Sequence, residues 1–288
     1  MRVGLFPGQG LDPMAVASEL DEHDPVLRRA NEVLQYDVKR SVERVARRPG
    51  GVLPTAVAQP AIFTAGIIAF RNAVMGGSQF DCLIGHSLGE YTALVAARSI
   101  PFAEGLELVS ARASTMQRVA KATPGGMAAI MNLSLGDVRD ICRETGMTVA
   151  NDNSPTQVVV SGNKTALARG AKVARVRGGR SVLLPVDGAY HSVAMEPAAR
   201  ELAYALDKTN VRSPKVEVIS NVTAAPYRAP GEIRKLLARQ LTHPVRFRES
   251  VANLSRNDVE FVDLGPGNVV GRLARATSAH HVGSEVGV

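Results

Sequence analysis

The sequence predicts an α/β protein in which a compact insert interrupts a longer alternation of strands and helices. Two observations carry this prediction. Short apolar runs that end in glycine turns precede helical stretches, and residues 127–186 follow a different order of elements. With 288 residues, 45% of them hydrophobic, the chain is long enough for a large domain that carries a smaller one.

The first part of the chain contains two short strands and a long helix. Residues 3–10, VGLFPGQG, form an apolar run that ends in a glycine and proline turn, which is typical of a buried strand followed by a tight loop. Residues 59–75 are densely apolar over too many positions for a strand, and therefore favour a buried helix. Residues 81–84 form a strand that turns through Gly85 and Gly89 into another helix.

The pattern changes at Met127. A strand is followed by a helix that Ser134 opens, two strands flank a turn at Asn153, and a helix and a last strand complete the segment at residues 164–177 and 181–186. This β-α-β-β-α-β order is that of a ferredoxin-like unit of about seventy residues. We expect the insert to span residues 123–191, between two halves of the large domain at 1–122 and 192–288.

Beyond the insert the longer α/β pattern returns. The expected elements are a helix at 197–209, a strand at 216–221, a helix at 231–240, an amphipathic stretch at 247–254 and a strand at 259–267. The closing fifteen or so residues, which include His280 and His281, are expected to be a frayed tail. We expect no metal site at these two histidines.

Charge and composition limit the function classes. A formal charge of +7 and a pI near 9.7 favour acidic partners. Nucleic acid is not expected, because aromatic residues are only 4% of the chain and there is no tryptophan to stack on bases. The densest basic group, which we interpret as a solvated face, comprises Arg169, Lys172, Arg175, Arg177 and Arg180.

The sequence gives no sign of a membrane segment or of export. We find no run of eighteen apolar residues and no signal-peptide pattern at the N-terminus, and therefore expect a cytoplasmic protein without membrane contact. Cys82 and Cys142 lack metal-ligand spacing, and a chain of this size does not need a disulfide, so we interpret them as buried or incidental thiols.

The strongest chemical signal is the G-x-S-x-G motif at residues 85–89. Small residues on both sides allow a strained turn that exposes the Ser87 hydroxyl above a sheet, and the strand before and helix after supply that context. The N-terminus of the helix beyond Leu88 offers an unpaired N–H group and a favourable dipole to an oxyanion. By itself the motif also suits a hydrolase.

A serine at neutral pH needs a base, and the chain has six histidines. His191 is the best candidate because it lies where the insert rejoins the large domain, and a domain junction is a common place for a cleft. The alternative is a histidine satisfied within the core. Asp187 is close in sequence, but a loop of four residues does not ensure triad geometry, so a backbone or amide carbonyl remains an alternative partner for the imidazole.

Arg112 is an unusual charge on an apolar helix face. It shares that face with Leu108, Thr115 and Val119, which lie four residues before, three after and seven after it. From the residues alone we prefer a snorkelling side chain or a buried ion pair. The functional alternative is a forked partner for a substrate carboxylate.

Over essentially its whole length the sequence resembles the malonyl-CoA:acyl carrier protein transacylases and the related acyltransferases of polyketide synthases. The matching segments occur in the family's order: FPGQG at 6–10, AQPAI at 58–62, GHSLGEY at 85–91, the Arg112 helix, NSPTQVVVSG at 153–162, GAYHSVAM at 188–195, QLTHPVRF at 240–247 and DLGPG at 263–267. The resemblance implies an α/β-hydrolase-like core with a ferredoxin-like insert and the site between them.

The resemblance also implies the roles of individual residues. Ser87 would carry the acyl group, and His191 would remove its proton and later activate the carrier's phosphopantetheine thiol. The backbone N–H groups of Gln9 and Leu88 would form the oxyanion hole, and Arg112 would pair with the malonyl carboxylate. The carbonyl of Gln240 would orient the histidine in place of an acid. The implied partners are malonyl-CoA and an acyl carrier protein, with no cofactor and no metal, and we expect a monomer.

Two departures from the family pattern bear on these expectations. The family commonly reads GQGSQ at the start, whereas Leu11 and Asp12 follow Gly10 here, so the loop beyond Gln9 differs. Tyr190 stands where malonyl-selective relatives often have phenylalanine. Methylmalonyl-selective domains often have serine there and tyrosine two positions earlier, where this chain has Gly188, so the pattern favours malonyl.

Three alternative functions remain open at this stage. A thioesterase would use the same serine and let water take the place of the carrier thiol. A transacylase could instead take another carboxyacyl-CoA such as methylmalonyl-CoA. A degenerate relative would only dock carrier proteins, which the joint presence of Ser87, His191, Arg112 and Gln9 argues against.

Overall fold

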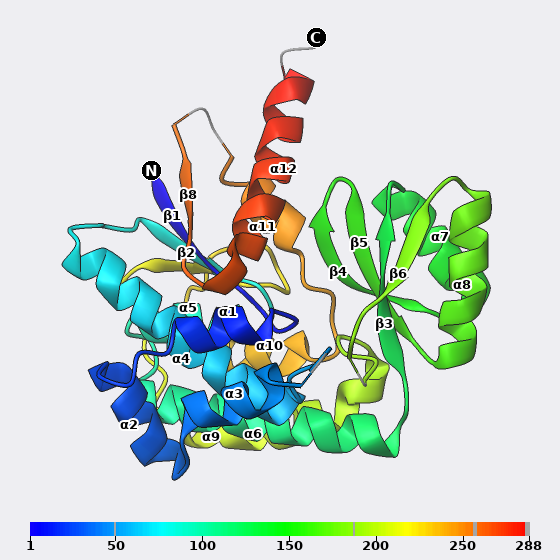
Figure 1. Ribbon diagram of the computed structural model, residues 1–288. Helices are drawn as coiled ribbons and strands as arrows, with labels where there is room; N and C mark the ends of the chain where they lie inside the picture. The colour runs from blue at the N-terminus through cyan, green and yellow to red at the C-terminus, as the bar shows by residue number, and fades with distance from the viewer. Residues whose placement is uncertain (49, 187, 256–257, 286–288) are drawn as a thin grey trace.

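The computed structural model describes residues 1–48, 50–186, 188–255 and 258–285, with side chains as far as Ala279. The described chain forms two four-stranded sheets with helices packed around them, which confirms the predicted α/β class. Figure 1 shows the larger part, built from both ends of the chain, beside the smaller sheet with its two helices, drawn in green.

The sheet of the larger part is parallel and carries the N-terminal strand at its centre. Its strands are β1 (Arg2–Phe6), β2 (Cys82–Gly85), β7 (Glu217–Ile219) and β8 (Glu260–Asp263), in the order β7-β2-β1-β8. Phe6 pairs with Gly85 at the carboxyl ends of β1 and β2. The loops that leave these two strands therefore meet at the same edge of the sheet.

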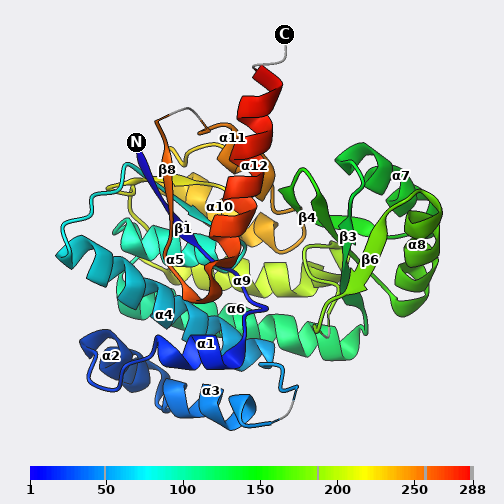
Figure 2. The same ribbon diagram turned by 45° about the horizontal axis from the view of Figure 1, so that its top comes forward.

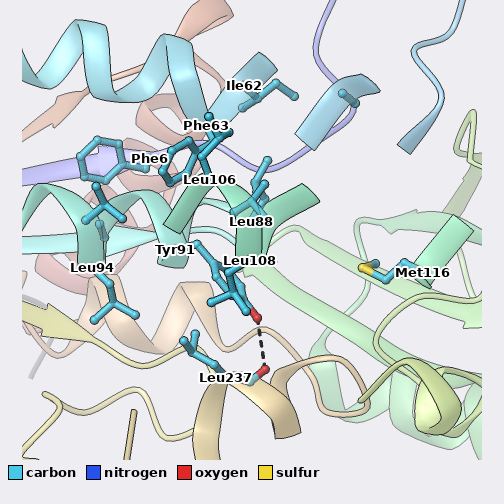
Figure 3. Packing of buried hydrophobic residues seen from close by; sticks show 14 of the residues in the cluster. Phe6, Ile62, Phe63, Leu88, Tyr91, Leu94, Leu106, Leu108, Met116 and Leu237 are labelled. Atoms are coloured by element: carbon cyan, nitrogen blue, oxygen red, sulfur yellow. Dashed lines mark hydrogen bonds between the residues drawn. The ribbon is translucent and has the colours of Figure 1, made fainter. Parts of the chain in front are cut away.

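The core of the large part is built by helices that the apolar pattern largely predicted. They are α4 (Thr55–Met75), α5 (Gly89–Ala96), α6 (Phe102–Ala122), α9 (Glu196–Lys208), α10 (Pro230–Gln240) and α11 (Phe247–Ala252). Figure 3 shows Phe6 packed among Phe63, Leu88 and Leu106, with the Tyr91 hydroxyl donating to the Leu237 carbonyl at 3.3 Å. Residues far apart in the chain thus share one core.

Helix α4 is long and apolar enough to cross a membrane by length and composition, but more than half of that window is buried inside the protein. It packs against α6, α5 and α3 (Val38–Ala46). A helix that is apolar on all sides suits the centre of a large domain, and the packing places α4 there.

Three helices between β1 and α4 had no counterpart in the apolar pattern: α1 (Pro13–Ser18), α2 (Pro25–Leu34) and α3. Each begins at an aspartate, Asp12, Asp24 or Asp37, whose carboxylate accepts a hydrogen bond from a backbone N–H of the first turn. The capping aspartates were a signal available in the sequence.

The smaller part of the molecule has the predicted β-α-β-β-α-β order. Its elements are β3 (Gly126–Met131), α7 (Leu135–Thr145), β4 (Thr148–Ser154), β5 (Gln157–Gly162), α8 (Lys164–Val176) and β6 (Arg180–Leu183). The strands are antiparallel in the order β4-β5-β3-β6. Helix α6 leads directly into β3 and so connects the two parts, as Figure 2 shows.

The two parts are also joined by hydrogen bonds across the cleft. Val245, which precedes α11, forms a parallel bridge to Asn151 on β4, with its N–H donating to Ala150 O at 2.9 Å. Arg248 lies 2.9 Å from Asp152 in an ion pair whose carboxylate is buried. This seam fixes the position of the small sheet beside the large one.

The expectation of a frayed C-terminal tail is wrong. A helix, α12 (Val269–Glu285), continues the chain after the short turn η2 (Pro266–Asn268). Its buried Val270 and Ala274 pack in the cluster with Val3 and Phe247. The burial of this helix against β1 and α11 is tertiary packing, which the weak local pattern did not indicate. The His280 and His281 side chains lie outside the described residues.

The described cysteines and basic residues match their sequence interpretation. Cys82 and Cys142 are free and buried. All five members of the predicted basic group lie on or beside α8 and are exposed. Arg177 pairs with Glu144 of α7.

Helix α7 offers a test of local capping. Ser134 and Asp137 form a reciprocal capping box, with the Asp137 N–H donating to Ser134 Oγ at 3.1 Å. Ser134→Ala should lower the free energy of unfolding by about 1 kcal/mol, because it leaves a backbone donor without its acceptor. Urea unfolding measures this loss. Ser134→Thr retains the cap and serves as control, and equal losses in both variants would contradict the capping role.

Candidate active site

Ser87 lies on a strained turn between β2 and α5. Its φ of 52° is in the left-handed region, which residues other than glycine rarely adopt. A Cβ on Gly85 would come within 1.9 Å of the Gly89 carbonyl carbon, and one on Gly89 would come within 2.2 Å of Phe6 O. Only glycine fits at either position, so the motif spacing is dictated by this close approach of turn, helix and β1.

Asn221, which sequence analysis missed, forms hydrogen bonds with the backbone of this turn. Its Oδ1 accepts from the Ser87 N–H at 2.7 Å, and its Nδ2 donates to Gly85 O at 2.6 Å. Asn221 is fully buried just after β7, the strand next to β2. A polar residue at the carboxyl end of a neighbouring strand was the only signal that could have found it.

His191 meets the serine hydroxyl directly. Its Nε2 lies 2.8 Å from Ser87 Oγ, and its Nδ1 lies 2.8 Å from the backbone carbonyl oxygen of Gln240. A carbonyl accepts, so Nδ1 carries the proton and Nε2 is free to take one. Burial, with the nearby Arg112 charge adding to it, lowers the pKa of His191 to about 3. The imidazole is therefore neutral at ordinary pH and available as a base.

The partner of His191 Nδ1 is the Gln240 carbonyl and not a carboxylate. In the described part of the chain no carboxylate lies within ion-pair distance of His191. Asp187 lies outside the described residues. The histidine is only 4% exposed, and its own φ of 55° shows that it is also held at a constrained turn.

Arg112 is buried beside the nucleophile. It is 1% exposed, and its Nη2 donates to Ser87 Oγ at 3.0 Å and to Gln240 Oε1 at 3.0 Å. The preference for a snorkelling side chain is therefore wrong, because α6 is covered by α4 and α9 and the Arg112 side chain is buried. The ion-pair alternative also fails, since no carboxylate lies within 4.0 Å of this guanidinium among the described residues.

A chain of amides connects Arg112 with the N-terminal loop. Arg112 Nη1 donates to Gln59 Oε1 at 2.7 Å, and Gln59 Nε2 donates to Gln9 Oε1 at 3.1 Å. Gln59 is fully buried on α4. Although the matching AQPAI segment contains it, sequence analysis gave it no role. The loop beyond Gln9 turns at Gly10, with φ of 96°, and Asp12 caps α1, which shows how the departure from the family pattern is accommodated.

Two backbone N–H groups close to Ser87 in the site have no acceptor among the described residues. Within the described chain, neither Leu88 N–H nor Gln9 N–H donates a hydrogen bond to the protein. The Gly8 backbone lies against His86, because a Cβ there would come within 2.8 Å of His86 O. The loop of Gln9 is thus packed against the serine turn.

The side chain of Gln240 has contacts that sequence analysis did not anticipate. Its Oε1 accepts from Arg112, while its Nε2 donates to Ser87 O at 2.8 Å and to the carboxylate of Glu90. Gln240 therefore contacts the base through its backbone and the serine turn through its amide. Glu90, inside the matching GHSLGEY segment, also received no role.

The site opens into a cavity of about 230 Å³ between the two sheets. Ser87, His191 and the Pro7–Gly10 loop form one wall. The other wall comes from the small sheet and α12, with Met127, Ala129, Asn151, Asn153, Gln157, Val159, Val270 and Leu273. The cavity is mostly apolar with a few convergent polar groups, which is typical of a small-molecule site.

The other described histidines do not reach the serine hydroxyl. His86 Nε2 lies 2.7 Å from Asn153 Oδ1 on the small sheet, and burial lowers its pKa. His23 precedes α2, and His243 pairs with Arg239 and Thr242. Of the described histidines, His191 alone is in contact with Ser87.

A serine on a strained turn, in contact with a neutral histidine, is an arrangement that suits acyl transfer through a serine hydroxyl. The chain belongs to the acyl transferase domain family, whose model matches residues 3–283.

Named relatives are similar over most of their length. The malonyl CoA-acyl carrier protein transacylase of Bacillus subtilis is 36% identical over 283 residues, covering 94% of this chain and 88% of that protein. The polyketide biosynthesis malonyl CoA-acyl carrier protein transacylase BaeC of Bacillus velezensis is also 36% identical, covering 92% and 93%.

Solved structures show the same similarity in three dimensions. The malonyl CoA-acyl carrier protein transacylase of Coxiella burnetii superposes with a TM-score of 0.88 at 32% identity, covering 96% of this chain and 91% of that one. A malonyl transacylase solved in complex with its type II polyketide synthase acyl carrier protein also has a TM-score of 0.88, at 31% identity, covering 96% and 93%.

The tight approach at Gly89 predicts a steric requirement. Gly89→Ala should lower the free energy of unfolding by about 1–3 kcal/mol and slow modification of Ser87, because the new methyl group would displace Phe6 O or the serine turn. Thermal unfolding and labelling with a fluorophosphonate measure the two effects. Gly136→Ala, where the nearest atom would lie 3.5 Å away, is the control and should be neutral or slightly stabilising. Normal stability and labelling of Gly89→Ala would contradict the steric argument.

Proposed function

We propose that this protein transfers a malonyl group from malonyl-CoA to the phosphopantetheine thiol of an acyl carrier protein through an acyl-Ser87 intermediate. The observation that carries the proposal is the buried Arg112 guanidinium, 3.0 Å from Ser87 Oγ. A fixed cation so close to the acylated atom favours a short acyl group that ends in a carboxylate. The names of the relatives support the same substrate and partner.

In the first half-reaction, His191 Nε2 takes the proton of Ser87 as Oγ attacks the thioester carbonyl carbon. The oxyanion accepts hydrogen bonds from the N–H groups of Gln9 and Leu88. Each such hydrogen bond contributes on the order of a hundredfold or more to the rate. Collapse of the tetrahedral intermediate breaks the carbon–sulfur bond, and the imidazolium returns its proton to the departing coenzyme A sulfur. The Gln240 carbonyl holds the ring and stabilises its charged form.

The second half-reaction reverses these roles. His191 removes the proton of the carrier thiol, whose sulfur attacks the acyl carbon of the ester on Ser87. The same two N–H groups stabilise the new oxyanion, and collapse breaks the bond to Oγ. The imidazolium then gives its proton to Oγ, which regenerates the serine. No redox step is involved, and the chemistry needs no cofactor or metal.

The same proposal includes the finer description of the fold. The parallel sheet with its serine turn supports an α/β-hydrolase-like large domain at 1–122 and 192–288, and the antiparallel order β4-β5-β3-β6 supports a ferredoxin-like insert at 123–191. We further infer a cytoplasmic monomer that meets its carrier protein at the cleft between the two parts.

Two related activities are distinguished by experiment. A thioesterase would share the serine, histidine and oxyanion donors, but an uncharged acyl pocket would serve it better than Arg112. A methylmalonyl preference would depend on the wall at Tyr190, which is buried with its hydroxyl 2.9 Å from Thr55 Oγ1. One methyl group changes selectivity by only about 1–3 kcal/mol, so the pocket favours malonyl modestly.

Purified protein mixed with malonyl-CoA should gain the mass of one malonyl group on Ser87, and the adduct should move to a holo acyl carrier protein. Intact-mass spectrometry measures both steps, and Ser87→Ala is the control that should gain no mass. Rapid loss of the adduct to water without transfer would support a thioesterase instead. More extensive acylation of Ser87 by methylmalonyl-CoA than by malonyl-CoA would identify methylmalonyl-CoA as the preferred substrate.

Arg112→Ala should weaken malonyl transfer by roughly 1.5–3 kcal/mol, about 10- to 150-fold, because a charged hydrogen bond to the carboxylate is lost. Acetyl transfer should stay similar or improve. The measured quantity is the malonyl-to-acetyl ratio of acylation rates, which cancels any general loss of folded protein. Arg118→Ala, on the same helix but in an exposed ion pair, is the matched control. An unchanged ratio in Arg112→Ala would refute the carboxylate role.

A further inference from the structure

A buried carboxyl group lies next to the active site and takes no part in the chemistry described above. Glu90 is fully buried on the first turn of α5, three residues after the nucleophile. Lys, Glu, Arg and Asp are almost never fully buried unless they are paired. Its burial next to the serine turn therefore calls for a structural reason.

Every close contact of the Glu90 carboxylate is with a hydrogen-bond donor. Oε1 accepts from the Tyr227 hydroxyl at 2.6 Å and from the Asn221 N–H at 2.8 Å, and Oε2 accepts from Gln240 Nε2. A carboxylate satisfies all three donors, whereas a protonated carboxyl would present its own O–H to one of them. These hydrogen bonds favour the ionised form.

Two of the residues that donate to Glu90, Asn221 and Gln240, also form hydrogen bonds with the active-site residues. Asn221 accepts from the Ser87 N–H and donates to Gly85 O. Gln240 donates to Ser87 O, accepts from Arg112, and presents its backbone carbonyl to the catalytic histidine. The Glu90 carboxylate thus forms hydrogen bonds with Asn221 and Gln240, which in turn contact the Ser87 turn, His191 and Arg112.

The charged and titratable groups that face Glu90 are few. Arg112 on α6 is the positive charge that acts on it. Tyr91 on α5 and Tyr227 after β7 have pKa values raised by burial and stay neutral. From α10 it meets only the neutral amide of Gln240. No carboxylate, Glu90 included, lies within 4.0 Å of Arg112 in the described chain, so Glu90 and Arg112 act on each other as buried charges without direct contact.

We propose that Glu90 is a positioning residue of the acyl-transfer site, whose ionised carboxylate sets Asn221 and Gln240 in place and balances the buried charge of Arg112. The proposal rests on the proposed function only for the choice of substrate in its test. It assigns to the GHSLGEY segment a carboxylate that acts on Ser87 through Asn221 and Gln240.

The protonation state of Glu90 should make the acylation of Ser87 depend on pH. Burial raises the pKa of Glu90 to about 7, although its hydrogen bonds and Arg112 oppose that shift. The supporting, ionised form is therefore lost as pH falls through about 7. The pKa of His191 is near 3, so the base stays neutral over that range. Acylation of Ser87 should fall below neutral pH because of Glu90, and not because the histidine becomes protonated.

The test follows Ser87 acylation from pH 5 to pH 9 in the wild type, Tyr227→Phe and Glu90→Gln. Malonyl-CoA and a fluorophosphonate are used in parallel, so that reactivity of the serine is measured with and without the proposed substrate. Tyr227→Phe removes one donor to the carboxylate and should move the inflection upward by about one pH unit. Glu90→Gln should lower acylation about 10- to 100-fold and abolish the inflection.

The outcomes separate the proposal from a purely structural role. An inflection that stays at the wild-type pH in Tyr227→Phe, or that persists in Glu90→Gln, would overturn it and assign the titration to His191. If Glu90→Gln does not fold, as judged by thermal unfolding, the shift in Tyr227→Phe decides alone. A fluorophosphonate inflection that moves as expected, without any malonyl adduct, would support the role of Glu90 and refute the proposed function.

Discussion

The burial of one guanidinium group against the serine hydroxyl is the interaction on which the rest of the site depends. Removing a charge from water costs several kcal/mol even after the protein relaxes, and the cost is offset only when hydrogen bonds surround the group. Arg112 donates from its two terminal nitrogens to neutral oxygens of Gln59, Gln240 and Ser87 rather than to a carboxylate, and its buried Nε has no acceptor among the described residues. Amide partners leave the positive charge available to an incoming anion.

This arrangement explains why so many segments meet at one point. The amide partners of Arg112 come from α4 and α10, and the serine comes from the turn after β2. Only the carboxyl edge of a parallel sheet brings such distant segments together without long exposed loops. The small sheet then closes the cleft from the side, joined to the large part through Val245 and the Arg248–Asp152 pair. The cavity is therefore a product of both parts.

The histidine shows how the choice of orienting group affects chemistry. A buried carboxylate beside the imidazole would raise its pKa and place a second negative charge near the acyl carboxylate. The Gln240 carbonyl fixes the same tautomer without that charge. Burial and Arg112 keep the ring neutral, so the base needs no proton loss before it acts. The negative charge lies instead on Glu90, which contacts the Gln240 side chain and not the imidazole.

The sequence by itself determined the local chemistry. Gly85 and Gly89 around Ser87 indicated a strained turn, and the alternation of apolar runs indicated the α/β class and the order of elements in the insert. Ser134 marked the start of α7, because a capping side chain acts on backbone within its own turn. These features depend on residues close together in the chain, so their pattern is visible without the fold.

Only the tertiary structure decided what each polar side chain contacts. Arg112 was interpreted as snorkelling because its helix face says nothing about which helices cover it. Asn221, Gln59 and Glu90 carry no spacing signal, since they form hydrogen bonds with partners 136, 50 and 137 residues away in the chain. The C-terminal helix α12 was missed because its stability comes from packing against β1 and α11. Hydrogen bonds and burial between distant segments are set by the way the sheets bring them together, which no local pattern encodes.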